Sequence, residues 1–203
     1  MATVIYPSPV FGPVKSRRLG RSLGVNLLPE DGKVCSFDCI YCECGFNDDF
    51  RPKAKLPTRE CVRTELEKRL SAMKAAGETL DALTFSGNGE PTSHPDFDRI
   101  ADDVKLLRDK YYPEAKVCLL TNATHLTKPR VFEAVKKLDK ACLKLDTVNP
   151  EYIRFVDRPN CPYDVNVVIE RMKACGGRCI IQTMFMKGTW QGKSVDNTTD
   201  DYV

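Results

Sequence analysis

The sequence has few histidines and none of the long apolar runs that mark a membrane protein. Only two histidines, His94 and His125, occur in 203 residues. Neither has a plausible nucleophile beside it, so hydrolase chemistry is unsupported. No stretch approaches the roughly 20 apolar residues of a membrane span. The N-terminus is broken by prolines and lacks the basic start and apolar run of a signal peptide. We therefore expect a cytoplasmic protein with no membrane partner.

Charge is nearly balanced, whereas cysteine is abundant. A net charge of +3 argues neither for nor against a nucleic-acid partner. Ten cysteines are many, but the chain is longer than the small secreted domains that use disulfide frameworks. Cys118, Cys142 and Cys179 lie in apolar, strand-like settings, so we expect them to be small buried hydrophobes. A different kind of group lies in "KVCSFDCIYCECG", which contains Cys35, Cys39, Cys42 and Cys44.

Helical spacing alternates with short apolar runs along most of the chain. Helices are predicted at 57–77, 94–113, 128–140 and 164–177, and strands at 21–29, 80–87, 115–122, 142–148 and 178–185. This alternation implies right-handed βαβ units and a parallel sheet. We predict one α/β domain over residues 1–203, a partial parallel (β/α) barrel resembling a TIM barrel. Residues 1–21 form an N-terminal extension, and the barrel begins at about residue 22.

Polar segments follow the first three predicted strands: the cysteine loop, then "SGNGEPT", then "TNATH". Function in such barrels lies at the carboxyl ends of the strands. The segment 196–203, "DNTTDDYV", reads as the start of another helix. The strand at 178–185 would then have a poorly protected edge. We therefore expect that the last βα elements of the barrel are missing from this chain, or that another element covers that edge.

The spacing of the cysteines favours a soft metal centre. Three thiolates at Cx3Cx2C spacing could hold three irons of a cubane cluster and leave the fourth open for chemistry, whereas ferredoxin-type clusters use four. Only one residue separates Cys42 from Cys44, which strains joint ligation and favours three ligands. The alternatives are a zinc site, a redox pair formed by Cys39 and Cys42, a purely structural group, and an electron-transfer cluster that includes Cys44.

The segment Cys35-Ser-Phe-Asp-Cys39-Ile-Tyr-Cys42 resembles the CxxxCxΦC signature of the radical S-adenosylmethionine (radical SAM) superfamily, with Tyr41 as the aromatic. Together with "GPVKSRRLGRSLGVNLLP" and "LTFSGNGEPTSHP", it resembles the group related to wyosine-type tRNA-modifying iron–sulfur oxidoreductases. The resemblance covers roughly residues 11–190. It implies a barrel of radical SAM type.

The resemblance implies that Cys35, Cys39 and Cys42 ligate a [4Fe–4S] cluster whose open iron binds S-adenosylmethionine (SAM). An external one-electron reductant of flavodoxin or ferredoxin type would drive reductive cleavage of SAM to a 5′-deoxyadenosyl radical. That radical would abstract hydrogen from an unidentified substrate. The SAM-binding positions implied are Ser86, Gly87, Asn88, Gly89, Glu90, Asn122, Lys144, Asp146, Thr183 and Tyr41. Catalytic residues beyond these are not assigned.

Each polar position also has a structural interpretation. Glu90 could cap the following helix, Asn122 could serve a turn, and Lys144 could pair with Asp146 inside the barrel. Cys44 is more readily a free neighbour than a ligand. The basic run before the first predicted strand could bind a phosphate-bearing substrate or RNA, or be a solvated segment; it comprises Lys15, Arg17, Arg18 and Arg21.

Three specific functions stay open within this interpretation. They are wyosine-like tRNA modification, glycyl-radical activation, and a non-catalytic iron–sulfur or zinc module. The wyosine group uses a second cluster from cysteines upstream, and no cysteine precedes Cys35 in this chain. The substrate is not specified by the sequence.

Overall fold

The fold is built on a mixed sheet in which all but one strand are parallel. The computed structural model describes residues 3–49 and 51–199. The sheet has six strands in the order β1-β2-β3-β4-β5-β6, and β1 (Val10–Ser16) runs antiparallel to β2 (Gly20–Val25). The remaining strands are parallel: β3 (Ala82–Phe85), β4 (Lys116–Thr121), β5 (Lys140–Lys144) and β6 (Cys179–Gln182). The predicted α/β fold with a parallel sheet is therefore confirmed.

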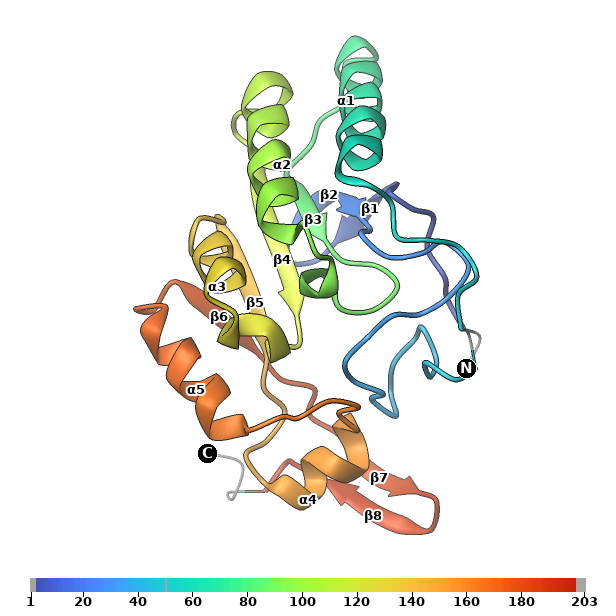
Figure 1. Ribbon diagram of the computed structural model, residues 1–203, viewed down its shortest axis with the longest axis vertical. Coiled ribbons are helices and arrows are strands. Elements are labelled where there is room, and N and C mark those ends of the chain that lie inside the picture. Colours follow the sequence, from blue (N-terminus) through green and yellow to red (C-terminus); the bar gives the residue numbers. More distant parts are fainter. Residues whose placement is uncertain (1–2, 50, 200–203) are drawn as a thin grey trace.

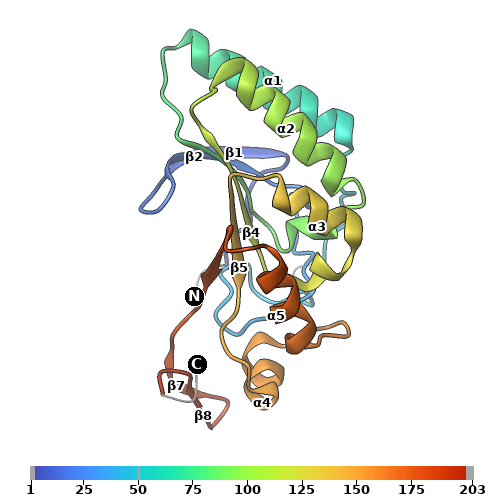
Figure 2. The ribbon, with the colours of Figure 1, turned by 90° about the vertical axis from the view of Figure 1, so that its left-hand side faces the viewer.

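The main helices cover one face of this sheet, as Figure 2 shows. They are α1 (Arg59–Ala75), α2 (Phe97–Tyr111), α3 (Pro129–Lys136) and α5 (Val165–Ala174), each between two successive parallel strands (Figure 1). Shorter turns follow the strands: η1 (Pro91–Ser93), η2 (Thr124–Thr127), α4 (Pro150–Tyr152) and the π-helix η3 (Ile153–Asp157). The four predicted helices are confirmed. Among the described residues, no helix has the length and apolarity needed to cross a membrane.

The two faces of the sheet differ in chemistry because successive side chains of a strand point to opposite sides. The face under the helices is apolar and buried, with Leu23, Val25, Leu83, Phe85, Val117, Leu119, Ala141 and Leu143 in one core cluster. The intervening positions face the helix-free side, and apart from the apolar Leu120 and Ile180 they are small or polar, such as Ser22, Gly24, Thr84, Cys118, Cys142, Lys144 and Gln182. This side can therefore line a polar cavity while the helix side supplies the core.

Helix boundaries follow the expected local signals. The Thr58 side chain accepts a hydrogen bond from the N–H of Cys61 and caps α1, and Gly77 follows its end with φ of 68°. The helix α2 ends at Tyr111, shortly before Pro113, which cannot continue a helix.

Two hairpins were not predicted. The strand β1 contains Pro13, which argues against a central strand, but β1 lies at the sheet edge where a missing N–H is tolerated. The basic run therefore lies in and beside a hairpin and not ahead of the first strand. A second hairpin joins β7 (Lys187–Trp190) to β8 (Lys193–Asp196) through Gln191 and Gly192. Both turn residues have positive φ, as a type I′ turn requires.

The expected element at 196–203 is not a helix in its described part, since β8 ends at Asp196 and 197–199 are irregular. Residues 200–203 of that prediction lie outside the described residues. The edge strand β6 exposes Ile180 and Ile181, 46% and 53% accessible, which agrees with the expected unprotected edge.

Candidate functional site

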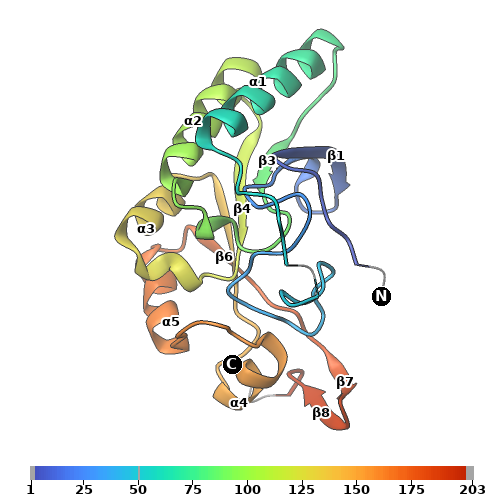
Figure 3. The ribbon, with the colours of Figure 1, turned by 45° about the vertical axis from the view of Figure 1, so that its right-hand side comes forward.

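The loop that leaves β2 lies at the carboxyl ends of the central strands and carries the clustered cysteines (Figures 1 and 3). Its anchor is Lys33, whose side chain is buried. The Lys33 ammonium donates to the carbonyl of Gly45 at 2.7 Å and to Asp38 at 3.2 Å. A parallel bridge between Val34 and Gly89 joins the same loop to the segment after β3. The loop is therefore held from inside by a charged group and from one side by backbone pairing.

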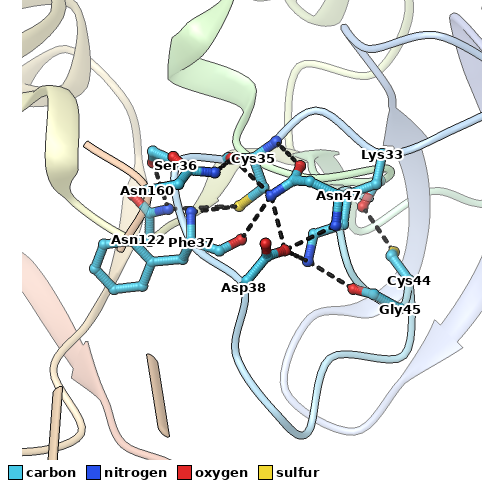
Figure 4. Close-up of polar contacts among 11 residues, drawn as sticks. Lys33, Cys35, Ser36, Phe37, Asp38, Cys44, Gly45, Asn47, Asn122 and Asn160 are labelled. Carbon is cyan, nitrogen blue, oxygen red and sulfur yellow. Dashed lines mark hydrogen bonds and ion pairs between the residues drawn. The ribbon is translucent and has the colours of Figure 1, made fainter. Parts of the chain in front are cut away.

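Asn47 closes this loop on itself, as Figure 4 shows. Its side-chain oxygen accepts from the N–H of Cys35 at 3.0 Å, and its amide nitrogen donates to the Cys35 carbonyl at 3.1 Å. The same nitrogen donates to Asp38 at 2.7 Å. From β4, the side chain of Asn122 donates to Ser36 at 2.9 Å and approaches the Cys35 sulfur at 3.6 Å. These contacts set the direction of the Cys35 side chain.

The thiols of the loop have different proton affinities. None of its cysteines is in a disulfide. Burial raises the pKa of Cys35 to about 12 and raises that of Cys39 well above its ordinary value. Hydrogen bonding with the Cys44 thiol lowers the pKa of Cys42 to about 6. The Gly87 carbonyl, 3.6 Å from the Cys44 sulfur, is the alternative acceptor for the single S–H of Cys44. Cys44 is thus engaged by its neighbours, Cys42 and Gly87.

The donor set fits a cluster in which separate irons take separate thiolates. Among the described residues, no three Cys, His, Asp or Glu side chains are placed to hold a single metal ion. Cys35, Cys39 and Cys42 are nevertheless close enough for their charges to act on one another. A cubane requires thiolates on different irons, so its ligands lie around a group and not on one point. Three free thiols on one loop meet that requirement.

A cavity of about 470 Å³ joins this loop to the strand ends. Nine of the residues predicted from the sequence line it: Cys35, Cys39, Tyr41, Gly89, Glu90, Asn122, Lys144, Asp146 and Thr183. Arg17 and Arg18 of the basic run also line it, as does Met184, which follows Thr183. The sequence did not indicate the remaining lining residues, which are Phe37, Leu120, Thr121, Cys142 and Gln182. A larger hollow of about 590 Å³ lies beside α4 and β8 and contains none of the predicted site residues.

Ser86, Gly87 and Asn88 are not among the residues that line this cavity. Asn88 is fully buried, and its amide nitrogen donates to Pro29 at 2.7 Å and to Tyr6 at 2.9 Å. Ser86 and Gly87 line a separate hollow of about 240 Å³. These three positions therefore shape the segment after β3 and attach it to the N-terminal segment.

Gly87 and Gly89 are required by contacts within the protein. Both have left-handed φ values, 133° and 131°. A Cβ on Gly89 would lie 2.0 Å from the Val34 carbonyl oxygen, and one on Gly87 would lie 2.6 Å from the Asn26 side chain. Glycine at these two positions therefore allows the close approach of the cysteine loop and of the segment after β2.

Glu90 joins the ends of β3 and β4. Its carboxylate accepts from the N–H of Thr92 at 3.0 Å, from the Thr121 hydroxyl at 2.6 Å and from the N–H of Asn122 at 2.7 Å. It therefore caps η1, and not the helix near residue 94 that the sequence suggested, while also lining the cavity. Burial raises the pKa of Glu90 despite these donors. The oxygen that faces Asn122 has one donor, which leaves it a free lone pair.

Lys144 lies in a buried ion network. Its ammonium donates to Tyr41 at 2.6 Å, to Asp157 at 2.8 Å and to Asp146, and the Tyr41 hydroxyl donates to Asp146. An ammonium has three donors, so all are engaged. Burial disfavours the Lys144 charge, but Cys39 and the two aspartates outweigh it and raise the Lys144 pKa. Burial, reinforced by Asp146, raises the pKa of Asp157 to about 7 against the opposing effect of Lys144.

The structure thus brings together most predicted residues and adds some that the sequence did not indicate. Asp157 lies in the π-helix η3, where no periodic pattern distinguished it. Cys142 could have been predicted from the sequence, because it lies two positions before Lys144 on the same strand and therefore points to the same face of the sheet. Thr183 donates to the Leu145 carbonyl at 2.7 Å, and the N–H of Met184 donates to Asp146 at 3.0 Å, so the segment after β6 is tied to β5.

Comparison with known proteins gives consistent matches. A model of the Radical SAM superfamily matches residues 30–189. A UPF0026 protein of Helicobacter pylori is 31% identical over 90% of this chain, which spans 58% of that relative's length. The structure of TYW1 with a lysine-pyruvate adduct has a TM-score of 0.57 at 13% identity, covering 83% of this chain and 56% of that one. The anSMEcpe structure with bound AdoMet has a TM-score of 0.54 at 20% identity, covering 79% and 42%.

Proposed function

This chain belongs to the radical SAM superfamily, and we propose that Cys35, Cys39 and Cys42 hold a [4Fe–4S] cluster with which it cleaves SAM reductively. When bound, these cofactors supply a 5′-deoxyadenosyl radical that abstracts a hydrogen atom from a substrate. The family match supports the cofactor chemistry. The observation that carries the assignment to this site is the shared cavity of Cys35, Cys39 and the polar ends of β3, β4 and β5.

The protein's own groups prepare this cavity. Asn47 and Asn122 hold Cys35 in place before any cofactor enters. Phe37, 2% accessible, packs edge-on against the ring of Tyr163 at 5.0 Å and keeps water from the base of the loop. A preformed and partly dry site is what a reactive radical requires, because stray hydrogen donors would quench it.

We assign the binding of SAM to the polar residues at the carboxyl ends of the strands. The free lone pair of Glu90 can accept from the SAM ammonium. Asn122 lies between Glu90 and Cys35. We assign Asp146 to the ribose and Thr183 to the adenine because both line the cavity, and Lys144 holds Tyr41 and Asp146 in position. In this proposal Ser86, Gly87 and Asn88 act indirectly, by setting the backbone that presents Gly89 and Glu90.

The cluster requires one electron per cleavage, and we propose an external one-electron reductant of flavodoxin or ferredoxin type as its source. Cys35 and Cys42 are partly buried whereas Cys39 is buried, so we propose that the reductant approaches the side of the motif that carries Cys35 and Cys42. Cys42 lies near the charge of Lys33, which favours its thiolate.

Wyosine-like tRNA modification is the second candidate for the specific reaction. The fold likeness to TYW1 favours it, and the lack of any cysteine before Cys35 in this chain weighs against it. Glycyl-radical activation and a non-catalytic iron–sulfur or zinc module are further candidates, and no contact in the cavity favours either. SAM cleavage distinguishes the enzymes from the module, because only an open iron binds and cleaves SAM.

The test is formation of 5′-deoxyadenosine by anaerobically reconstituted protein with dithionite and SAM. We expect wild type and Cys44→Ala to form it and Cys39→Ala not to. Cys118→Ala, at a buried cysteine of β4 outside the loop, is the matched control and should behave as wild type. If wild type binds iron and sulfide yet forms no 5′-deoxyadenosine, the electron-transfer module replaces this proposal.

A further inference from the structure

The tip of the β1–β2 hairpin brings two arginines to the wall of the cavity. Arg17 and Arg18 both line it, together with Cys142 and Gln182 of the helix-free sheet face. Figure 2 shows the reason, since the hairpin projects on the side of the sheet opposite the helices. The charge of Arg18 also reaches the thiol of Cys142, where it opposes the increase in pKa that burial causes. The hairpin tip thus faces the middle of the sheet.

Among the described residues, neither guanidinium has a protein partner. Within residues 3–49 and 51–199, Arg17 and Arg18 form no ion pair and no side-chain hydrogen bond, and Arg18 uses only its backbone N–H, at 3.3 Å from Ser16. Arg21, on the same hairpin, is paired with Glu78. Two adjacent arginines beside the main polar cavity therefore have no acidic partner in the part of the chain that the structure describes.

The other charged groups of the cavity are already engaged. All three donors of Lys144 are used by Tyr41, Asp146 and Asp157. Glu90 is buried among its donors after β3. An incoming anion would therefore find its free cationic donors only at Arg17 and Arg18 among the described lining residues. Adjacent guanidinium groups suit phosphate, whose oxygens accept paired N–H bonds.

We propose that Arg17 and Arg18 bind a phosphate group of a small-molecule substrate at the sheet side of the cavity, across from the cofactor end. This deepens the proposed function and rests on it. Arg17 and Arg18 line the same cavity of about 470 Å³ that is assigned above to SAM, so the phosphate would lie at the hairpin end of a shared space. A phosphate held at the hairpin tip would position the rest of the molecule along the helix-free face, toward the cysteine loop.

The test is isothermal titration of purified protein with inorganic pyrophosphate at about 0.1 M salt, where screening suppresses weak surface binding. The test variant is Arg17→Gln/Arg18→Gln, and the matched control is Lys15→Gln/Lys55→Gln. Lys15 and Lys55 are exposed cations that do not line the cavity, so both double variants lose the same charge. Arg18→Lys keeps the charge and removes the planar fork. Thermal unfolding of every variant confirms that it folds.

We expect the arginine double variant to lose about tenfold or more in pyrophosphate affinity, the control to stay within about twofold, and Arg18→Lys to fall between them. Equal losses in both double variants would show a general charge effect and overturn the proposal, as would no binding by wild type at about millimolar pyrophosphate. If single-stranded RNA binds through the two arginines and pyrophosphate does not, the partner of this site is RNA and not a small molecule.

Titrations of metal-free and cluster-loaded protein separate this inference from the function on which it rests. If the protein binds pyrophosphate through the arginines but forms no 5′-deoxyadenosine, the anion site is supported and the proposed radical chemistry is rejected. A chain that forms 5′-deoxyadenosine but shows no arginine-dependent binding keeps the proposed function and loses the phosphate site.

Discussion

The ammonium of Lys144 lies 2.8 Å from the carboxylate of Asp157, and this contact joins the sheet to the π-helix beneath the cysteine loop. The backbone of that π-helix also pairs with the loop, since the N–H groups of Asp38 and Ile40 donate to the carbonyls of Asp157 and Val156. One buried cation therefore sits where strand, helix and cysteine loop meet. The loop's position depends on this junction.

Replacing the buried cation should destabilise the fold. Lys144→Met leaves Asp146 and Asp157 buried together without their cation, and we expect a loss of about 3–5 kcal/mol in the free energy of unfolding. Lys140→Met, on the same strand and without an ion pair among the described residues, should change it by less than about 1 kcal/mol. Urea unfolding of metal-free protein measures both. If the two variants lose similar free energies of unfolding, the ion network of Lys144 does not stabilise the fold as predicted.

Adding one methyl group at Gly89 should be far more costly than at an open glycine. Gly89→Ala combines a left-handed φ with overlap against the Val34 carbonyl, and we expect a loss of at least about 3 kcal/mol. A Cβ on Gly188 would meet no atom within 4 Å, and its φ is not positive, so Gly188→Ala should stay within about 0.5 kcal/mol. Chemical denaturation compares them, and a mild effect at Gly89 would show that the loop can shift.

Removing the Asn47 clamp should loosen the cysteine loop while leaving the sheet intact. Asn47→Ala deletes the acceptor for the Cys35 N–H, and we expect that amide to exchange with solvent at least about tenfold faster, with a loss of about 1–3 kcal/mol. The backbone amides of β4 should exchange with solvent at the same rate as in the wild type. Asn166→Ala, at an exposed position of α5, is the control. Unchanged exchange at Cys35 would show that Asn122 alone suffices to hold it.

The pH dependence of stability should contain a contribution from Asp139. Burial alone would raise its pKa, but the N–H of Val117 at 2.7 Å and the Arg108 guanidinium at 2.8 Å hold the pKa of Asp139 below its ordinary value. A carboxyl with a lowered pKa stabilises the fold above its unfolded pKa, about 3.9, and loses this as pH falls through the folded value. Asp139→Asn should therefore cost about 1–3 kcal/mol at pH 7 and progressively less below about pH 4.

Asp109→Asn provides the comparison for that titration. Asp109 contacts the same arginine at 2.6 Å, but its side chain is 60% exposed, so its loss should cost less than about 1 kcal/mol. Unfolding midpoints measured from pH 3 to pH 8 for both variants would reveal the difference. If the loss in free energy of unfolding caused by Asp139→Asn does not decrease at acidic pH, the contact depends on the shape of the side chain and not on its charge.

Most of the elements could be predicted because their signals are local. Helix periodicity, the Thr58 cap and the apolar face of each strand depend on neighbours in the chain, and these signals indicated five parallel strands and four helices in the right order. The strand β1 was missed because Pro13 weakens the strand signal, and only its position at the sheet edge makes proline acceptable there. The β7–β8 hairpin was missed because Gln191-Gly192 is a weak turn signal.

The sequence by itself determined the family, the βα alternation and the donor types available at the strand ends, because motif spacing and periodicity are properties of the chain. Tertiary structure decided which of those donors are already used. Glu90, Lys144 and Asn88 find their partners across long separations in sequence, 103 residues between Lys144 and Tyr41. Within residues 3–49 and 51–199, Arg17 and Arg18 are left without partners by the same folding. Pairing depends on distance in space, so only the folded sheet separates groups that hold the protein together from groups free to bind a ligand.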